Sequence, residues 1–161
     1  MSIYLKCLKN NVLMDKAEKS NLLGELPEWD LDDLYPSPDS KRISEDIGWL
    51  KVECKAFASD YEGKLSSLTA NNMLICIKRY EKIEMVSGRI MSYAGLRYYQ
   101  KTTDETRTKF LTDNQDKITN ITSDLIFFSL EINKLVEHKL NALLKTNADL
   151  RRYKPIFDRL R

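Results

Sequence analysis

The chain has 161 residues, a length that suits one domain with a modest hydrophobic core. Charged residues make up 31% of it and hydrophobic residues 42%, which excludes an intrinsically disordered protein. The 26 basic and 24 acidic residues leave a net charge of +2, so the chain lacks the concentrated basic charge of a nucleic-acid-binding protein.

Residues 1–24 are polar and weakly patterned, and we expect a loosely ordered N-terminal segment before a helical domain over 25–161. Charged residues interrupt the first part of this segment, which therefore lacks the apolar core of a signal peptide. No apolar run approaches the ~20 residues needed to cross a membrane. Cys7, Cys54 and Cys76 form no CxxC motif. These features predict a cytoplasmic protein with reduced cysteines and no membrane partner.

Residues 26–40, LPEWDLDDLYPSPDS, contain three prolines, which oppose a continuous helix. We expect an extended strap. The apolar side chains that could pin it to the helices are Trp29, Leu31, Leu34 and Tyr35. Asp30, Asp32 and Asp33 resemble a calcium loop only faintly, because the central glycine and the terminal glutamate of an EF-hand are absent. Turn and capping roles are expected for these aspartates instead.

A first long helix is predicted from about Asp39 to Tyr61. Its apolar residues recur at steps of four and three: Ile43, Ile47, Leu50, Cys54, Phe57 and Tyr61. This seam is too short to require a free-standing coiled coil, so packing inside a helical domain is expected. Gly63 follows the helix at a position suited to end it.

Residues 69–131 are predicted to form two long helices joined by a short turn at 100–103. The first begins near Thr69 and carries apolar Met73, Ile77, Tyr80, Ile83, Ile90, Ala94 and Tyr98. The second carries apolar Leu111, Ile118, Ile121, Leu125, Phe128 and Ile132. At its start, Thr102 and Glu105 have the spacing of a capping box. Because the turn is short, the helices are expected to pack as a long antiparallel hairpin.

A line of small residues, Gly88, Ser92 and Gly95, follows one side of the first helix of this hairpin. Glycine in a helix interior costs about 1 kcal/mol relative to alanine, so something is expected to pack closely here. A neighbouring helix is the simpler interpretation, and a groove that faces a ligand is the alternative.

Three tyrosines and two arginines gather near the tip of the predicted hairpin: Tyr93, Tyr98, Tyr99, Arg89 and Arg97. They could stack on a peptide or donate hydrogen bonds to it. A tyrosine-rich packing corner is the simpler interpretation.

Shorter helices are predicted at 134–144 and at about 148–153, and Pro155 is expected to open a last segment that runs to Arg161. This segment stops without a helix cap, so we expect a fragment of a longer protein. No strand-like alternation persists in the sequence. The predicted fold is all-α, with a long antiparallel helical hairpin packed against the preceding long helix and the shorter C-terminal helices.

The sequence contains one histidine, His138, which lies beside Glu137 on a polar helix face. A zinc-hydrolase helix needs two histidines four residues apart, so these residues cannot supply such a site. A nucleophile elbow, a phosphate-binding loop and a GxGxxG motif are also absent. The sequence therefore indicates no catalytic, cofactor-binding or metal-binding residue, and it leaves substrate-binding residues unknown.

Four stretches carry a resemblance to a known family: LPEWDLDDLYPSPDS (26–40), FASDYEGKL (57–65), RYEKIEMVSGRIMSYAGLRYYQKTTDE (79–105) and DLIFFSLEIN (124–133). Together they resemble oligoendopeptidase F, a cytoplasmic zinc endopeptidase of the thimet oligopeptidase-like class. The resemblance covers about residues 26–160. Its most specific pieces are WDLDDLYPSPDS and MSYAGLRYY.

The resemblance implies a helical N-terminal domain that forms one wall of a deep channel for short peptides. In that family an HExxH helix and a later glutamate, both farther along the chain, bind the catalytic zinc. None of these ligands can be carried onto a position of this sequence. We therefore expect the N-terminal domain of a zinc-dependent oligoendopeptidase that by itself has no zinc and no activity.

The partners implied are the missing catalytic domain and, in the full-length enzyme, short peptides. Helices that normally pack on a catalytic domain should leave an apolar face uncovered, so we expect the isolated chain to self-associate, most simply as a two-fold dimer. The alternative is a non-catalytic helical interaction module or truncated pseudo-enzyme that dimerises through this face.

Overall fold

The computed structural model describes residues 29–160. The chain divides into two units, Met1–Asp30 and Leu31–Arg161, and the fold below is that of the second. Residues 29–160 contain helices and turns and no strand, so the predicted all-α class is confirmed. The expected N-terminal segment, 1–24, lies outside the described residues.

Helix α3, Lys41–Tyr61, begins slightly later than predicted and ends where expected. It buries Ile43, Leu50, Cys54 and Phe57, four members of the predicted seam. Gly63 then takes a φ of +76°, a conformation that glycine adopts without steric penalty. Its predicted role in ending the helix is therefore confirmed. A short 3-10 turn, Leu65–Ser67, leads to the next helix.

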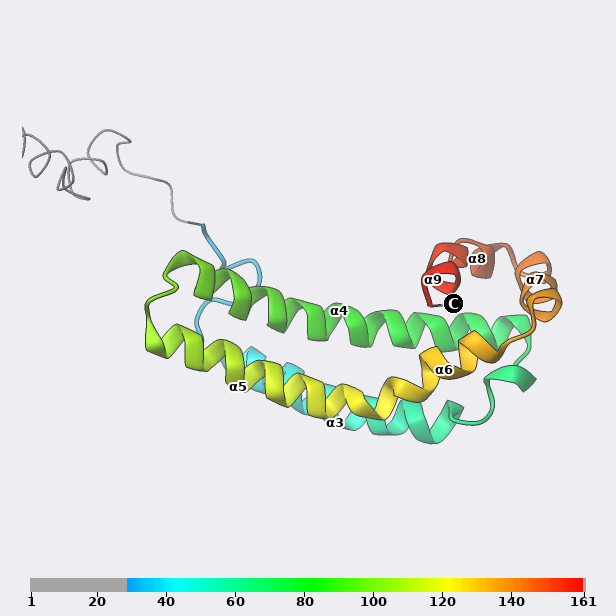
Figure 1. The fold of residues 1–161 in the computed structure, drawn as a ribbon, viewed down its shortest axis with the longest axis horizontal. Coiled ribbons are helices and arrows are strands. Elements are labelled where there is room, and N and C mark those ends of the chain that lie inside the picture. Colours follow the sequence, from blue (N-terminus) through cyan, green and yellow to red (C-terminus); the bar gives the residue numbers. More distant parts are fainter. Residues whose placement is uncertain (1–28, 161) are drawn as a thin grey trace, which may run out of the picture. The chain divides into compact units, whose positions relative to one another are not determined.

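Helix α4, Ala70–Gln100, runs along the whole length of the second unit (Figure 1). The hydroxyl of Thr69 accepts a hydrogen bond of 3.3 Å from the amide of Asn72, which fixes the helix start where the sequence predicts it. The residues that α4 buries include Met73, Cys76, Ile77, Ile83, Val86, Ile90, Tyr93 and Ala94. This continuous apolar side supports the rest of the core.

Helix α5, Glu105–Thr122, follows the turn and lies alongside α4 (Figure 1). Its N-cap is Asp104, whose carboxylate accepts hydrogen bonds from the amides of Thr106, at 3.0 Å, and Arg107, at 3.3 Å. The predicted capping box of Thr102 and Glu105 is therefore wrong. A carboxylate next to the first turn satisfies the free amides and also faces the positive end of the helix dipole.

The second long helix of the predicted hairpin is not continuous. It is interrupted by the 3-10 turn Ser123–Leu125 and resumes as α6, Ile126–Lys134. Two hydroxyls compete for backbone carbonyls at the interruption: Thr122 donates to Ile118 at 2.9 Å and Ser123 donates to Asn120 at 2.7 Å. The apolar spacing continues through the break, which is why periodicity alone predicts a single helix.

Three short helices complete the described fold: α7, Glu137–Thr146; α8, Ala148–Arg151; and α9, Lys154–Leu160. They correspond to the predicted C-terminal helices with shifted boundaries. The apolar residues that they bury are Leu140, Leu144, Leu150 and Phe157. In Figure 1 these helices gather beside the first half of α4.

A cluster of aromatic rings joins α3, α4 and α6 at the centre of the core. The Phe57 ring lies 5.6 Å from the Phe128 ring and 6.1 Å from the Tyr80 ring, centre to centre. Tyr80 and Phe128 stack at 4.2 Å. Such contacts add to the stabilisation that burial of the rings already gives.

The strap is held mainly by Tyr35, which is fully buried. Its hydroxyl donates a hydrogen bond of 2.6 Å to Asp46 Oδ2 of α3. Its ring meets the Tyr93 ring edge-on, with the centres 5.4 Å apart. Leu31 and Leu34 are partly buried against the same core. The strap therefore bridges α3 and α4.

Glu131 of α6 accepts two backbone hydrogen bonds from the connection between α3 and α4. The donors are the amides of Gly63, at 2.6 Å, and Leu65, at 3.3 Å. A carboxylate that accepts amide hydrogen bonds is a strong, charge-assisted partner. This pair of bonds ties α6 to a loop far away in the sequence.

Candidate functional site

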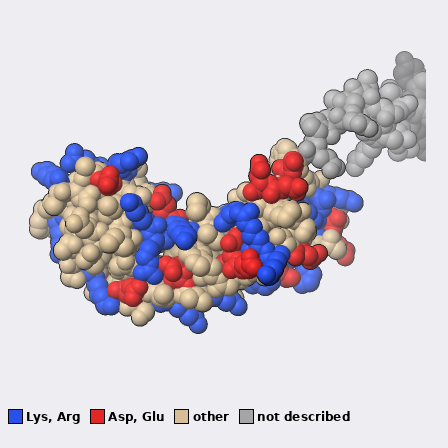
Figure 2. Space-filling model, turned by 180° about the vertical axis from the view of Figure 1, so that it is seen from behind, with Lys and Arg blue, Asp and Glu red and all other residues tan. Residues whose placement is uncertain are grey.

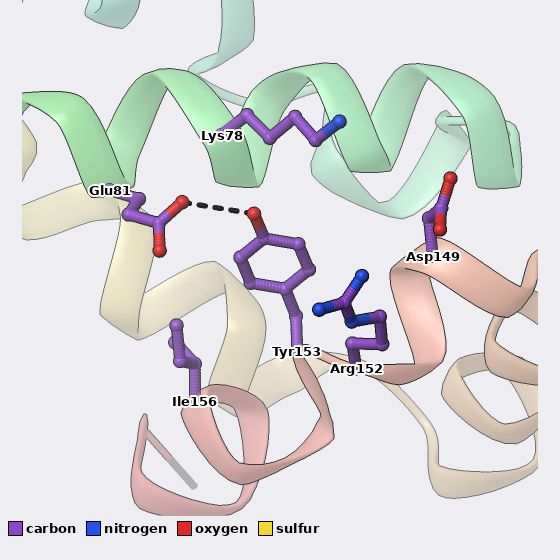
Figure 3. Close-up of a pocket in the computed structure, with 6 residues that line it drawn as sticks. All are labelled: Lys78, Glu81, Asp149, Arg152, Tyr153 and Ile156. Carbon is purple, nitrogen blue, oxygen red and sulfur yellow. Dashed lines mark hydrogen bonds between the residues drawn. The ribbon is translucent and has the colours of Figure 1, made fainter.

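A hollow of about 520 Å³ lies between α4 and the C-terminal helices (Figure 3). Its lining residues are Lys78, Glu81, Asp149, Arg152, Tyr153 and Ile156. The volume falls within the range of about 300–1,000 Å³ that is typical of small-molecule sites. We take it as the candidate site because five of its six lining side chains are charged or polar.

Two buried side chains anchor the C-terminal wall of the hollow: α8 packs against α4, and α9 packs against α6. Leu150 of α8 and Phe157 of α9 are both fully buried. Asn147 caps α8 by accepting a hydrogen bond of 3.0 Å from the Leu150 amide, and its own amide group donates to Asn71 of α4 at 2.8 Å. The residues between these anchors are thereby held beside α4, where they line the hollow.

Tyr153 and Glu81 are joined across the hollow. The tyrosine hydroxyl donates a hydrogen bond of 2.9 Å to Glu81 Oε2, as the dashed line in Figure 3 shows. Desolvation and this hydrogen bond raise the pKa of Tyr153 above its ordinary value. The hydrogen bond to Glu81 holds the Tyr153 ring beside α4.

The hollow contains two positive and two negative side chains. Lys78 and Arg152 supply the cations, and Glu81 and Asp149 supply the carboxylates. The salt bridges of residues 29–160 include none of Lys78, Arg152 and Asp149. Figure 3 shows Lys78 projecting from α4 and Arg152 and Asp149 from the opposite wall. These three charges are therefore available to a ligand.

The described residues do not fit a zinc site. His138 is exposed on α7, and no group of three or more His, Cys, Asp or Glu side chains comes together between residues 29 and 160. A zinc ion in a protein usually has four ligands, of which a catalytic site supplies three from the protein.

Cys54 and Cys76 are buried free thiols. Burial raises the pKa of Cys54 to about 11 and that of Cys76 to about 12. The thiolate is the reactive form of cysteine, so both side chains are poor nucleophiles at neutral pH. They behave as small core residues, as their apolar sequence positions indicate. Cys7 lies outside the described residues.

The tyrosines and arginines near the hairpin tip do not form one site. Tyr93 is only 2% exposed, and its ring packs against Phe110 with the centres 6.1 Å apart. The Arg97 guanidinium lies 5.7 Å from the centre of the Tyr93 ring. Tyr98 and Tyr99 form a separate tilted pair, and Tyr99 is 68% exposed. Tyr93 therefore has the packing role, whereas Tyr99 faces outward.

In the described part of the chain, no neighbouring helix covers the line of small residues. A Cβ atom added to Gly88 would meet nothing within 4 Å, and one added to Gly95 would meet only the Tyr99 ring, at 4.0 Å. The line instead forms the floor of a shallow groove beside Met91 and Leu96. The core of the hairpin uses the other side of α4.

Sequence reasoning did not identify the residues of the hollow. Tyr153 and Glu81 are 72 positions apart, and no local motif connects the two segments. The charges at positions 149–152 surround the apolar Leu150, which is also the ordinary pattern of an amphipathic surface helix. The hollow can be recognised only after the C-terminal helices have been placed on α4.

Comparisons of the chain with protein-family models, with curated proteins and with solved structures gave no significant match. Between residues 29 and 160, no helix is both long enough and apolar enough to cross a membrane.

Proposed function

We propose that this unit is the N-terminal helical domain of an oligoendopeptidase F-like zinc peptidase. In this role it forms one wall of a channel that admits short peptides. The catalytic zinc and the water that it activates belong to a separate catalytic domain, which is the partner of this chain.

One observation carries the proposal: the two most specific stretches of the resemblance lie against each other in the fold. Tyr35 comes from WDLDDLYPSPDS, and Tyr93 comes from MSYAGLRYY. Their rings are in edge-on contact, and the guanidinium of Arg89 lies 5.7 Å from the centre of the Tyr35 ring. Two stretches that form one packing unit are expected to occur together in a family. This contact supports a resemblance of the whole domain over a coincidence of two short segments.

The coding sequence that follows Arg161 gives a direct test. The proposal expects an in-frame HExxH motif and a later glutamate codon. Coding sequence without these ligands contradicts it.

A biochemical test uses a quenched fluorescent peptide. Mixing the chain with a separately produced, HExxH-containing fragment of an oligoendopeptidase F should increase chelator-sensitive cleavage. The chain alone should give none. A Tyr35→Ala variant, which removes the packing between the two stretches, should support less cleavage than a Tyr99→Ala control. If the fragment cleaves equally well with and without the chain, the proposal is wrong.

The second candidate is a non-catalytic module that dimerises through exposed apolar side chains. Ile126 and Leu130 stand one turn apart on α6 and are 60% and 53% exposed. Val136, which follows α6, is also exposed. Large apolar side chains that share one side of a helix are typical of an interface.

Sedimentation at increasing concentration distinguishes this candidate. A dimer should form at micromolar concentrations, and an Ile126→Lys/Leu130→Lys double variant should be monomeric. Val52→Lys, which alters an exposed valine of α3, serves as the matched control and should leave the dimer intact. A stable wild-type monomer at high micromolar concentration contradicts dimerisation.

A further inference from the structure

The charges of the hollow between α4 and the α8–α9 segment point to a particular kind of ligand. We propose that this hollow binds a small zwitterion of the α-amino-acid type. The carboxylate of the ligand lies beside Lys78 and Arg152, and its ammonium group lies beside Asp149. This inference does not depend on the proposed relationship to peptidases.

The cationic half of the site consists of two exposed basic side chains. Lys78 and Arg152 take part in none of the salt bridges of residues 29–160. The guanidinium of an arginine presents paired N–H donors that match the two oxygens of a carboxylate. The flexible Lys78 ammonium can approach the same oxygens from α4. A ligand carboxylate therefore gains charge-assisted hydrogen bonds here.

The anionic half of the site is Asp149. The other carboxylate, Glu81, already accepts a hydrogen bond of 2.9 Å from the Tyr153 hydroxyl. A polyanion such as phosphate would be repelled by both carboxylates, and a simple cation would be repelled by Lys78 and Arg152. A molecule that carries one charge of each sign satisfies both halves.

The remaining lining accommodates an aliphatic side chain. Ile156 of α9 provides an apolar contact, and the Tyr153 ring provides a flat wall. Because the hydrogen bond to Glu81 already fixes the ring, less side-chain freedom is lost when a ligand binds. Leucine, with both charges and an aliphatic side chain, is therefore a suitable probe.

Titration of the isotope-labelled protein, followed by amide chemical shifts in NMR, tests the proposal. Leucine should shift the amides of Glu81, Arg152 and Tyr153 and leave α5 unchanged. N-acetylleucine lacks the ammonium group and leucinamide lacks the carboxylate. Each should bind at least about tenfold more weakly than leucine.

Substitutions test whether Arg152 belongs to the cationic half of the site and Asp149 to the anionic half. Arg152→Gln and Asp149→Asn should each weaken leucine binding by at least about tenfold. Lys145→Gln and Asp116→Asn remove the same charges at exposed positions outside the hollow and should bind leucine as the wild type does. An otherwise unchanged spectrum shows that each variant is folded. The proposal is overturned if the protein binds the three ligands with equal affinity or if the variants bind leucine as tightly as the wild type does. It is also overturned if millimolar leucine shifts no amide around the hollow.

Discussion

At the scale of single residues, Tyr35 shows how one side chain holds a segment without regular secondary structure. Its hydroxyl reaches Asp46, and its ring lies against Tyr93. Arg89 adds a contact of 3.5 Å to the same carboxylate of Asp46. A buried hydroxyl needs such a partner, because loss of the bond leaves a polar group unsatisfied. Through this group the strap is held to both α3 and α4.

Substitution of Tyr35 by phenylalanine should lower the free energy of unfolding by about 1–2 kcal/mol, because Asp46 loses a hydrogen bond while the ring packing remains. Tyr99→Phe is the control: this side chain is exposed, so its removal should change stability by less than about 0.5 kcal/mol. Urea denaturation measures both variants. Equal effects would contradict the role of the Tyr35 hydroxyl.

The buried thiols make stability depend on pH in the alkaline range. The pKa values of Cys54 and Cys76 in the folded protein, about 11 and about 12, exceed the ordinary value of 9.0. As pH rises above 9.0, the unfolded chain therefore loses these protons before the folded protein does. Below pH 9.0 the two thiols should leave the free energy of unfolding unchanged. As pH rises from 9.0 toward 12, they should lower it.

Unfolding free energies measured at about pH 8 and about pH 10 test this dependence. A Cys54→Ala/Cys76→Ala double variant is the reference, because it keeps the titrating tyrosines and loses the thiols. The wild type should lose more stability between these two pH values than the double variant. Parallel pH profiles would show that the thiols do not contribute.

At the scale of elements, the sequence predicts the helices better than their ends. Regular apolar spacing identifies α3, α4 and α5, because each buries one continuous side. The break at Ser123–Leu125 is not visible in that spacing, because a 3-10 turn changes the backbone while Leu125 and Phe128 remain buried. Hydrogen bonds from hydroxyls to carbonyls decide such details, and these depend on three-dimensional geometry.

The start of α5 provides a test at this scale. Asp104 accepts both cap hydrogen bonds, so Asp104→Ala should lower the melting temperature. Thr102→Ala changes the residue that the sequence pattern favours and should have a smaller effect. Thermal unfolding followed by circular dichroism measures both. If Thr102→Ala lowered the melting temperature more than Asp104→Ala, Thr102 would be the N-cap, as the sequence pattern predicts.

At the scale of the whole molecule, the arrangement of α3, α4 and α6 depends on the aromatic cluster around Phe57. Its ring contacts come from all three helices. The salt bridges from Arg79 to Glu53 at 2.8 Å and to Asp60 at 2.7 Å join α3 and α4 beside the cluster. On the face shown in Figure 2, acidic and basic side chains are interspersed, as on an ordinary solvated surface.

Phe57→Ala should therefore destabilise the whole unit by about 3–5 kcal/mol, a large share of the stability of a typical domain. Val52→Ala changes an apolar residue of the same helix that is 70% exposed, and its effect should stay within about 0.5 kcal/mol. Chemical denaturation that monitors helix content compares the two. A small effect at Phe57 would show that the cluster does not organise the core.

The candidate site forms only when distant helices pack together, which explains why the sequence does not predict it. Lys78 and Glu81 are ordinary solvent-side residues of a long helix, and Asp149 and Arg152 are ordinary residues of a short one. Their meeting depends on the burial of Leu150 and Phe157 against the other helices. Local patterns carry information on which side of a helix is apolar, and they do not specify which distant charges come together.

The two hydrogen bonds accepted by Glu131 join it to Gly63, 68 positions earlier, and to Leu65, 66 positions earlier, so that they close a loop of chain that contains all of α4 and α5. Release of the connector after α3 from α6 requires loss of the hydrogen bonds that the Gly63 and Leu65 amides donate to Glu131. In deuterium-exchange experiments the Gly63 amide would therefore act as a sensor: rapid uptake there would report that its link to Glu131 has opened, even if every helix were intact.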